Sequence, residues 1–248
     1  MVTKLYKGIL AASLMILLAA CASEPVYTPQ PVQPQPIDLT AFAPRVETFV
    51  VVLDISSSMG EDYQDTPKVH TAQDLVASFN ATVPDAGFKA GLVTFGHGSG
   101  RCLGKGSADG IYGLADHDRS AFAGALGSIA CAGGTTPMSE GIDATAQMLS
   151  GEAGSVAVIV VSDFQWVSAD RVVQSVERLK AQHPGKLCLH TVKVGDNTTG
   201  DAMIAAMANA PGCDSSGTAA AIATAGGMAT FVTDPLIGEF SDRTRTPI

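Results

Sequence analysis

The chain has 248 residues, of which 46% are hydrophobic and 16% are charged. This length and hydrophobicity exclude a disordered protein and indicate one large domain or two small ones. The 24 acidic residues outnumber the 15 basic ones, and no basic cluster occurs, which argues against a general nucleic-acid binder. The five cysteines are an odd number, so we expect one of them to have a different role.

Residues 1–20 have the pattern of a bacterial secretory signal peptide. Lys4 and Lys7 give a basic start, and the uncharged, predominantly apolar run that follows is too short to span a bilayer about 30 Å thick. The run ends in Leu-Ala-Ala-Cys at residues 18–21, which resembles the bacterial lipobox. This resemblance implies that Cys21 is lipidated and becomes the new N-terminus. Ordinary secretion, with Cys21 left as a free thiol, is the alternative.

The lipobox implies a protein of the bacterial cell envelope that is held to a membrane by acyl chains on Cys21. Ala22 follows the cysteine, and by resemblance to the usual lipoprotein sorting rule this favours the outer membrane. Residues 21–44 are rich in proline and glutamine, which favours extended polyproline II structure. At about 3.1 Å per residue, twenty such residues reach roughly 60 Å, so we expect a tether between bilayer and domain. A proline-rich ligand for another protein is the alternative.

Strand and helix patterns then alternate along the chain. Continuous β-branched runs predict buried strands, and apolar residues at helical spacing predict helices. The predicted strands are 49–53, 88–95, 111–114, 156–161 and 187–194. The predicted helices are 66–81, 119–130, 137–149, 169–182 and 201–208. Residues 213–234 are expected to add one short strand and a closing helix.

This alternation predicts an α/β fold with a Rossmann-like, doubly wound and mostly parallel sheet that has helices on both faces. The short run at 111–114 is expected to form an antiparallel edge strand. No internal repeat and no second domain are visible in the sequence. We therefore expect a single domain over residues 45–238 and a flexible tail over residues 239–248.

Oxygen-bearing side chains follow two predicted strands and precede one predicted helix. Asp54, Ser56 and Ser58 come directly after the first strand, a Gly-Gly-Thr-Thr-Pro turn occupies residues 133–137, and Asp163 follows the valine-rich strand. Ligands of open α/β sheets bind beyond the carboxyl ends of the strands, where these groups are expected to meet. Carboxylates and hydroxyls without Cys or His suit a hard cation rather than zinc. Helix capping is the structural alternative.

The Asp-x-Ser-x-Ser pattern at residues 54–58, the Gly-Gly-Thr-Thr-Pro turn and the strand-ending Asp163 resemble the von Willebrand factor type A domain over roughly residues 45–236. The resemblance implies a metal-ion-dependent adhesion site and no catalytic residues. Its implied ligands are Asp54, Ser56, Ser58, Thr136 and Asp163. Thr136 fits the family's Thr-Pro frame before an apolar helix position, and its neighbour Thr135 is one residue off. The implied ion is Mg²⁺, with Mn²⁺ and Ca²⁺ as alternatives.

The resemblance further implies a binding module in which the ion takes a carboxylate from an unknown protein partner. A structural envelope lipoprotein with a vestigial site and a metal-dependent hydrolase are the alternatives. For the hydrolase, no convincing general base accompanies the oxygen ligands. Trp166, the only tryptophan, follows Asp163, and we expect it to contact the partner rather than to form a packed cap on the sheet.

Four cysteines remain besides Cys21, and an exported compartment permits disulfides. The predicted fold places Cys102 and Cys131 at the edge of the sheet that carries the oxygen ligands, and Cys188 and Cys213 at the opposite edge. Other pairings would span the sheet, farther than the roughly 7 Å that a disulfide allows between Cα atoms. We therefore expect the bridges Cys102–Cys131 and Cys188–Cys213, with four reduced thiols as the alternative.

Overall fold

The computed structural model describes residues 26–40, 42–96, 107–208 and 213–239, and its centre is a six-stranded sheet in the order β6-β5-β2-β7-β8-β9. The strands are β2 (Thr48–Asp54), β5 (Lys89–Phe95), β6 (Ala108–Asp116), β7 (Val156–Ser162), β8 (Leu187–Lys193) and β9 (Ser215–Thr218). All neighbours pair in parallel except β5 and β6. The predicted α/β fold, mostly parallel with one antiparallel edge strand, is therefore confirmed.

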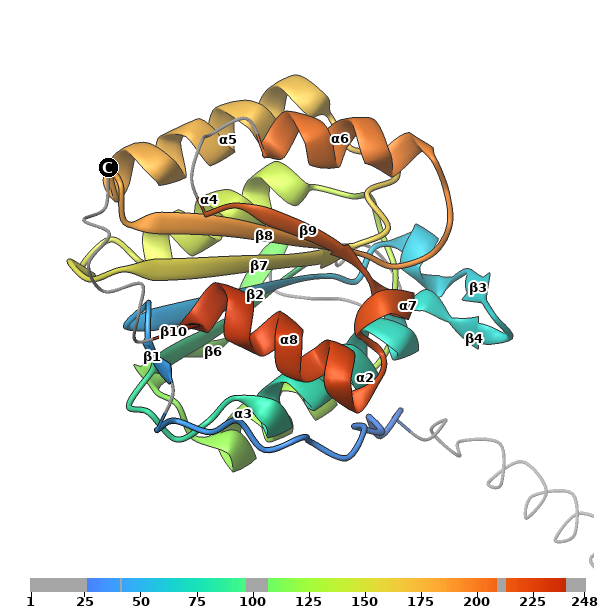
Figure 1. Ribbon diagram of the computed structural model, residues 1–248. Helices are drawn as coiled ribbons and strands as arrows, with labels where there is room; N and C mark the ends of the chain where they lie inside the picture. Colours follow the sequence, from blue (N-terminus) through green and yellow to red (C-terminus); the bar gives the residue numbers. More distant parts are fainter. Residues whose placement is uncertain (1–25, 41, 97–106, 209–212, 240–248) are drawn as a thin grey trace, which may run out of the picture.

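Helices cover both faces of the sheet (Figure 1). The helices on one face are α2 (Lys68–Thr82), α3 (Arg119–Gly127), α7 (Ala219–Ile222) and α8 (Ala225–Leu236). Those on the other face are α4 (Met138–Met148), α5 (Ala169–Gln182) and α6 (Thr199–Met207). The strands and helices that the sequence predicts thus occur in the predicted order, including the short strand and closing helix expected within residues 213–234.

The central strand β2 is buried along its whole length because both of its faces are covered. Its side chains alternate between two hydrophobic clusters, as the period of two in a strand requires. Phe49, Val51 and Leu53 belong to the cluster under α2, α3 and α8, whereas Val50 and Val52 belong to the cluster under α4, α5 and α6. The β-branched run therefore holds both helical layers on one sheet.

Some element boundaries differ from the sequence predictions. The edge strand β6 has nine residues instead of the expected four, and its burial is only partial. An edge strand has one exposed face, so it lacks the continuous apolar run on which the prediction rested. The helix expected from residue 66 starts at Lys68, because β3 (Asp62–Tyr63) and β4 (Thr66–Pro67) form a small hairpin before it, after the short 3-10 helix η2 (Ser57–Gly60).

The proline-rich stretch lies along the domain rather than away from it. We call residues 26–40 and 42–44 the strap. At its end, β1 (Phe42–Pro44) pairs antiparallel with β10 (Ile237–Glu239), and Ile37 and Leu39 pack against the core cluster under α2, α3 and α8. The strap passes below the sheet in Figure 1, close to α3 and α8. An extended proline-rich chain has the same composition whether it is free or docked, so the sequence pattern alone indicated only a tether.

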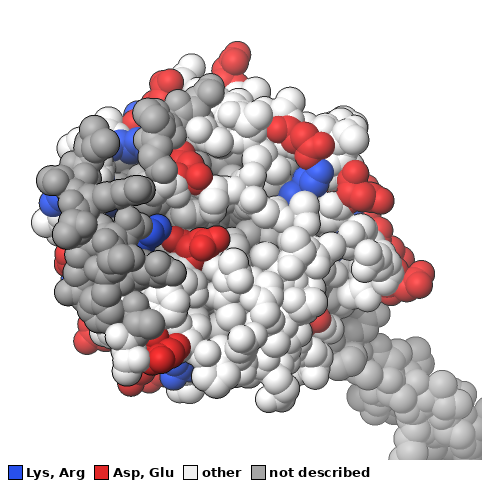
Figure 2. Space-filling model, viewed as in Figure 1, with Lys and Arg blue, Asp and Glu red and all other residues white. Residues whose placement is uncertain are grey.

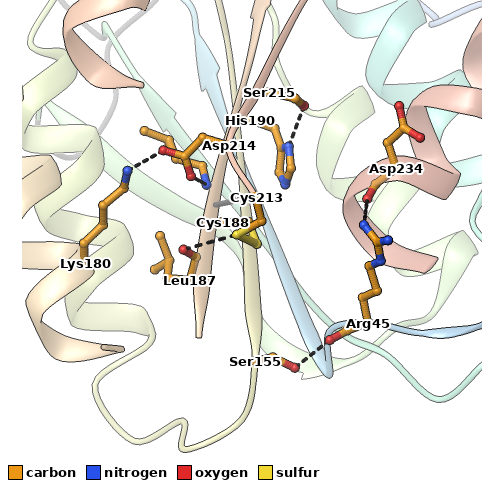
Figure 3. Close-up of a disulfide and its surroundings, with 11 residues drawn as sticks. Arg45, Ser155, Lys180, Leu187, Cys188, His190, Cys213, Asp214, Ser215 and Asp234 are labelled. Carbon is orange, nitrogen blue, oxygen red and sulfur yellow. Dashed lines mark hydrogen bonds and ion pairs between the residues drawn. A yellow bond between two sulfur atoms is a disulfide. The ribbon is translucent and has the colours of Figure 1, made fainter. Parts of the chain in front are cut away.

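The disulfide predicted at the amino ends of the strands is present. Cys188 and Cys213 are bonded, with their Cα atoms 5.2 Å apart, and the bridge joins the start of β8 to the residues before β9 (Figure 3). Beside it, Lys180 on α5 forms an ion pair with Asp214. Cys131 is also disulfide-bonded, but Cys102 lies outside the described residues, so the pairing Cys102–Cys131 stays a prediction.

The signal peptide, Cys21 and most of the expected tail likewise lie outside the described residues. Within the part of the chain that the structure describes, no helix has the length and apolarity needed to cross a membrane. Among the described residues on the face shown in Figure 2, Lys and Arg side chains are isolated and acidic side chains lie near them, so these residues form no continuous basic surface.

Candidate functional site

The loops after β2 and before α4 are bound together at the carboxyl edge of the sheet. The backbone N–H of Gly133 donates to the carbonyl of Ile55 at 2.7 Å, and the N–H of Ser57 donates to the carbonyl of Gly134 at 3.0 Å. On the other side, the N–H of Ile55 donates to the carbonyl of Phe95 at the end of β5. The structure therefore brings the Asp-x-Ser-x-Ser segment and the Gly-Gly-Thr-Thr-Pro turn together, as the predicted fold required.

Four of the five predicted ligands form one buried group, which we call the oxygen cluster: Asp54, Ser56, Ser58 and Asp163. The hydroxyls of Ser56 and Ser58 lie 3.4 Å apart, and the Ser58 hydroxyl donates to Asp163 Oδ1 at 3.2 Å. These side chains come from the ends of β2 and β7, which are neighbours in the sheet. Their oxygens therefore converge although 105 residues separate Ser58 from Asp163 in the sequence.

Asp54 accepts hydrogen bonds on both carboxylate oxygens. The backbone N–H of Ser56 donates to Oδ1 at 2.8 Å, and the Ser162 hydroxyl donates to Oδ2 at 2.5 Å. Complete burial raises the pKa of Asp54 to about 6, the Asp163 carboxylate adds to the rise, and the bonds from Ser162 and Ser56 oppose it. Burial thus makes the Asp54 carboxyl group costly to ionise, and a nearby cation would favour its charged form.

Asp163 accepts two hydrogen bonds on each oxygen. Besides Ser58, Oδ1 accepts from the backbone N–H of Gln165 at 3.0 Å. Oδ2 accepts from the Gln165 side chain at 3.1 Å and from Lys68 Nζ at 3.0 Å. The carbonyl of Asp163 accepts a further bond from the Asn197 side chain at 2.9 Å. Asp163 is therefore held in a fixed orientation at the base of the site.

Lys68 is a component of the site that the sequence analysis did not identify. It is the first residue of α2, its side chain is only 8% exposed, and it forms ion pairs with Asp163 and with the more exposed Glu61. Burial by itself would lower the pKa of Lys68, but the hydrogen bonds and charges of Glu61 and Asp163 outweigh it and leave the pKa above its ordinary value. The amine is therefore a permanent positive charge beside the oxygen cluster.

Asn197 is the second residue of the site that sequence reasoning missed. Its side chain donates to the Asp163 carbonyl, and its Oδ1 accepts from the backbone N–H of Gly200 at the start of α6 at 3.1 Å. A Cβ atom on Gly200 would lie 2.9 Å from the Asp163 carbonyl oxygen, so the close approach of α6 requires glycine. An Asn two residues before a helix is the only signal in the sequence, and it indicates a cap rather than a site.

The two candidate threonines differ in exposure within the same turn. Thr136 is half-buried and Thr135 is exposed. A ligand of an ion held by the buried oxygen cluster has to face inward, so burial favours Thr136 over its neighbour. Its part in binding stays a prediction.

Trp166 lies in the loop that follows Asp163, and its side chain is 83% exposed. Its backbone has a φ of 57°, the left-handed conformation that few non-glycine residues adopt. The exposure contradicts the packed-cap alternative. Contact with a partner stays a prediction.

The described histidines lie elsewhere in the fold. His70 stacks on Tyr27, His117 bonds to Asn80, and His190 bonds to Ser215 near the disulfide. Among the residues with described positions, no three side chains of the types His, Cys, Asp and Glu gather in a group that could hold a metal. Any ion at the carboxyl edge would therefore depend on hydroxyls as well as on the two carboxylates.

The oxygen cluster fits a hard cation in its donor chemistry, since it offers carboxylate and hydroxyl oxygens that already converge. One feature works against a cation, because the Lys68 ammonium occupies one face of Asp163. Asp54, Ser56 and Ser58 are the residues that could contact an ion directly, with Thr136 reaching it from the neighbouring turn.

Comparisons with known proteins agree with this architecture. Residues 49–165, just under half of the chain, match the family model of the von Willebrand factor type A domain. No curated protein matches the chain. Over residues 49–165, and in its fold, the chain is therefore similar to the von Willebrand factor type A domain.

Solved structures share the fold at low sequence identity. A von Willebrand factor type A protein from Catenulispora acidiphila is 17% identical with a TM-score of 0.53, and the match covers 75% of this chain but only 42% of that one. The vWF domain of a type V pili tip protein from Porphyromonas gingivalis is 11% identical with a TM-score of 0.56, covering 75% and 93%. The manganese-loaded TRAP protein of Plasmodium vivax is 15% identical with a TM-score of 0.51, covering 77% and 75%. At these identities the likeness concerns the fold.

Proposed function

We propose that the chain carries a von Willebrand factor type A domain that binds a divalent cation through Asp54, Ser56, Ser58, Thr136 and Asp163 and, through the ion, an acidic group of a protein partner. Mg²⁺ is the proposed ion, with Mn²⁺ and Ca²⁺ as alternatives. The observation that carries the proposal is the convergence of two buried carboxylates and two buried hydroxyls at one edge of the sheet. The manganese-loaded neighbour with the same fold supports a divalent ion.

The charge of the site explains why it would take an acidic partner. An ion held directly by Asp54 and neutral hydroxyls keeps part of its positive charge, because the Asp163 carboxylate is already balanced by Lys68. A carboxylate from outside would complete the coordination of the ion and lower that charge. The exposed Trp166, in the loop that follows Asp163, offers an aromatic contact for the same partner.

We further propose that the chain is a lipid-anchored protein of the bacterial cell envelope, attached through Cys21 and placed at the outer membrane. This proposal rests on the signal-peptide and lipobox patterns and on Ala22. Replacing Cys21 by Ser in the full chain is expected to release the protein from the membrane fraction. Retention of Cys21→Ser in that fraction would count against the anchor.

Cation binding can be tested with Mn²⁺, whose binding to the purified chain from residue 26 to 248 is measured by electron paramagnetic resonance. Asp54→Ala is expected to lower the affinity at least about tenfold, because it removes one of two charged donors. Asp143→Ala is the matched control, since Asp143 is an exposed carboxylate on α4 that pairs with Arg178 on the neighbouring helix α5. Equal Mn²⁺ affinity in wild type and Asp54→Ala would contradict the proposal.

A structural role with a vestigial ion site is the second candidate, and Lys68 is the observation that favours it. The ammonium already balances one buried carboxylate, so the site is stable without an ion. The two candidates differ in one result: the structural candidate predicts that an acidic peptide library binds the wild type equally well with Mn²⁺ and with chelator. The proposed binding function predicts acidic peptides that are retained only with Mn²⁺ and lost in Asp163→Ala.

A further inference from the structure

Lys68 occupies a position that its own helix disfavours. It is the first residue of α2, where the partial positive charge of the helix N-terminus repels a cation, and the first turn of α2 has no acidic residue. The side chain is nevertheless buried. A buried ammonium at this position needs compensation from other elements of the fold.

That compensation comes from three oxygens around Nζ. The ammonium donates to Asp163 Oδ2 at 3.0 Å, to Glu61 Oε2 at 2.9 Å and to the Ser58 carbonyl at 3.3 Å. An ammonium has three donors, so its hydrogen-bonding capacity is fully used. Two of the three acceptors belong to residues of the oxygen cluster itself. Lys68 is thus part of the site rather than a surface residue near it.

We infer that Lys68 is a built-in counter-cation of the oxygen cluster and that it sets the affinity for the divalent ion by competing with it for Asp163. This inference rests on the proposed cation-binding function. In the absence of an ion, the ammonium balances the charge of Asp163 and stabilises the carboxyl edge of the sheet. A divalent ion that enters the site meets a fixed positive charge a few ångströms away, so the site takes up the ion only weakly or only together with an acidic partner.

The test is Mn²⁺ binding to Lys68→Met, which keeps the length of the side chain and removes its charge. Its affinity is expected to rise at least about tenfold over wild type, since the repulsion is lost. Lys68→Gln provides a second neutral variant that still donates a hydrogen bond to Asp163, in case Lys68→Met does not fold. Lys89→Met is the matched control, because Lys89 pairs with Glu152 at the amino end of β5, and its affinity is expected to match wild type.

Thermal unfolding gives a readout that does not depend on ion affinity. In chelator, Lys68→Met is expected to melt below wild type, because Asp163 loses its counter-charge, and saturating Mn²⁺ is expected to reverse the difference. Equal or weaker Mn²⁺ affinity in both folded neutral variants would overturn the inference while leaving the proposed cation binding intact. Absence of Mn²⁺ binding in wild type and in all variants would overturn both. Binding in the neutral variants alone would support Lys68 as the counter-cation and reject cation binding by the natural chain.

A second inference rests on the strap, which docks on α2 in a defined direction. The Tyr27 hydroxyl donates to Asp74 at 2.8 Å and its ring stacks on His70 at 3.8 Å, whereas the backbone N–H of Val32 donates to Ser78 at 3.0 Å. Lower residue numbers in the strap therefore lie nearer the start of α2. Asp74 is only about 9 Å along the helix axis from Lys68, which contacts the oxygen cluster.

The chain thus leaves the domain toward the edge that carries the oxygen cluster. Between Val26, at the start of the described strap, and the lipobox Cys21 there are four residues, which span at most about 18 Å. We propose that the lipid anchor holds the domain close to the membrane with the oxygen cluster on the membrane-facing side. The partner would then be a protein of the same membrane surface. This proposal rests on the lipidation of Cys21.

The single tryptophan allows a direct measurement, because Trp166 lies in the loop that follows Asp163. The full lipidated chain is placed in vesicles with dansyl-labelled lipid headgroups, and energy transfer from Trp166 is recorded. Insertion of twenty Gly/Ser residues after Glu24 adds a flexible segment of about 25 Å and is expected to reduce the transfer by about half or more. The double variant Tyr27→Ala/Asp74→Ala, which releases the start of the strap, is expected to reduce it as well.

Equal transfer in wild type and in the insertion variant would overturn the close, site-facing arrangement. Failure of the wild type to bind vesicles, with the same result for Cys21→Ser, would instead reject the lipid anchor. The two outcomes are distinguishable because vesicle binding is measured first, by co-sedimentation, and energy transfer is measured only on the bound protein.

Discussion

His190 is a buried histidine whose protonation opposes folding. It lies on β8, where Nδ1 is 2.8 Å from the Ser215 hydroxyl, and Nε2 has no hydrogen-bond partner among the described residues (Figure 3). Burial lowers the pKa of His190 to about 4 from its ordinary value of 6.5, and the Asp214 carboxylate only partly opposes this. At pH values between about 4 and 6.5, His190 is protonated in the unfolded chain but neutral in the folded chain. Stability from this group is therefore complete above about pH 6.5 and is lost as the pH falls toward 4.

We predict that His190→Asn, which can keep the bond to Ser215 but does not titrate, loses less stability in acid than wild type. The wild type should lose up to about 3 kcal/mol more than His190→Asn between pH 7.5 and pH 4.5. Urea unfolding at the two pH values measures this difference. The comparison with the variant is needed because the raised pKa of Asp54 acts in the opposite direction over part of the same range. Parallel pH profiles for the two proteins would show that His190 is not the responsible group.

Gly96 is required by the close contact between β5 and the Asp-x-Ser-x-Ser loop. Its φ is 135°, and a Cβ atom would lie 2.6 Å from the backbone carbon of Ile55 and from the nitrogen of Ser56. We predict that Gly96→Ala destabilises the protein by about 3 kcal/mol and weakens Mn²⁺ binding, since the strain acts on the backbone of Ser56. Gly113→Ala is the control, because its Cβ would meet no atom within 4 Å. Urea unfolding of both variants checks the prediction, and similar stabilities would contradict it.

At the scale of residues, the sequence predicted the acidic and hydroxyl groups of the site but missed Lys68 and Asn197. Asp54 and Asp163 follow buried strands of one parallel sheet, so topology alone brings them to one edge. Lys68 follows a polar segment at the start of a helix, where a lysine normally faces solvent. Its burial depends on the hairpin of β3 and β4, which turns the chain back toward Ser58, and no periodic pattern indicates that hairpin.

At the scale of elements, the disulfide Cys188–Cys213 ties the edge strand β9 to β8. The two cysteines are 25 residues apart, and β9 has only four residues with parallel pairing to one neighbour. We predict that Cys188→Ser/Cys213→Ser loses about 3 to 4 kcal/mol, chiefly because the unfolded chain regains the entropy of an open loop. Urea unfolding of the oxidised proteins measures the loss. A loss near zero would show that β9 and its flanking helices are stable without the bridge.

Buried elements could be predicted from the sequence more accurately than exposed ones. The helix α5 has the predicted bounds 169–182, because apolar positions on one face alternate with charged ones on the other. The edge strand β6 is longer than predicted, and the paired strands β1 and β10 were not expected. Short and partly exposed strands carry little hydrophobic pattern. Hydrophobic periodicity therefore located the core layers, whereas the pairing that closes the domain depends on contacts between β1 and β10, which are far apart in the sequence.

At the scale of the whole molecule, the strap changes the extent of the folded unit. Pairing of β1 with β10 brings the strap and the last described strand together, and the Arg45 N–H donates to the Leu236 carbonyl at 2.8 Å. The strap also covers part of α2, whose first residue holds Asp163. Stability of the strap, the C-terminal strand and the oxygen cluster should therefore be linked.

Removal of the strap is the most direct test of this linkage. A chain that starts at Arg45 lacks Ile37, Leu39 and Phe42, which pack against the core, and it lacks the partner strand of β10. We predict a loss of about 3 kcal/mol relative to the chain that starts at Val26, since the buried apolar area outweighs the entropy of ordering an already extended segment. Urea unfolding measures the loss, and a chain that starts at Ser23 serves as control with unchanged stability. If the chain from Arg45 is as stable as the chain from Val26, the strap is only a tether, and the short distance between membrane and oxygen cluster no longer follows.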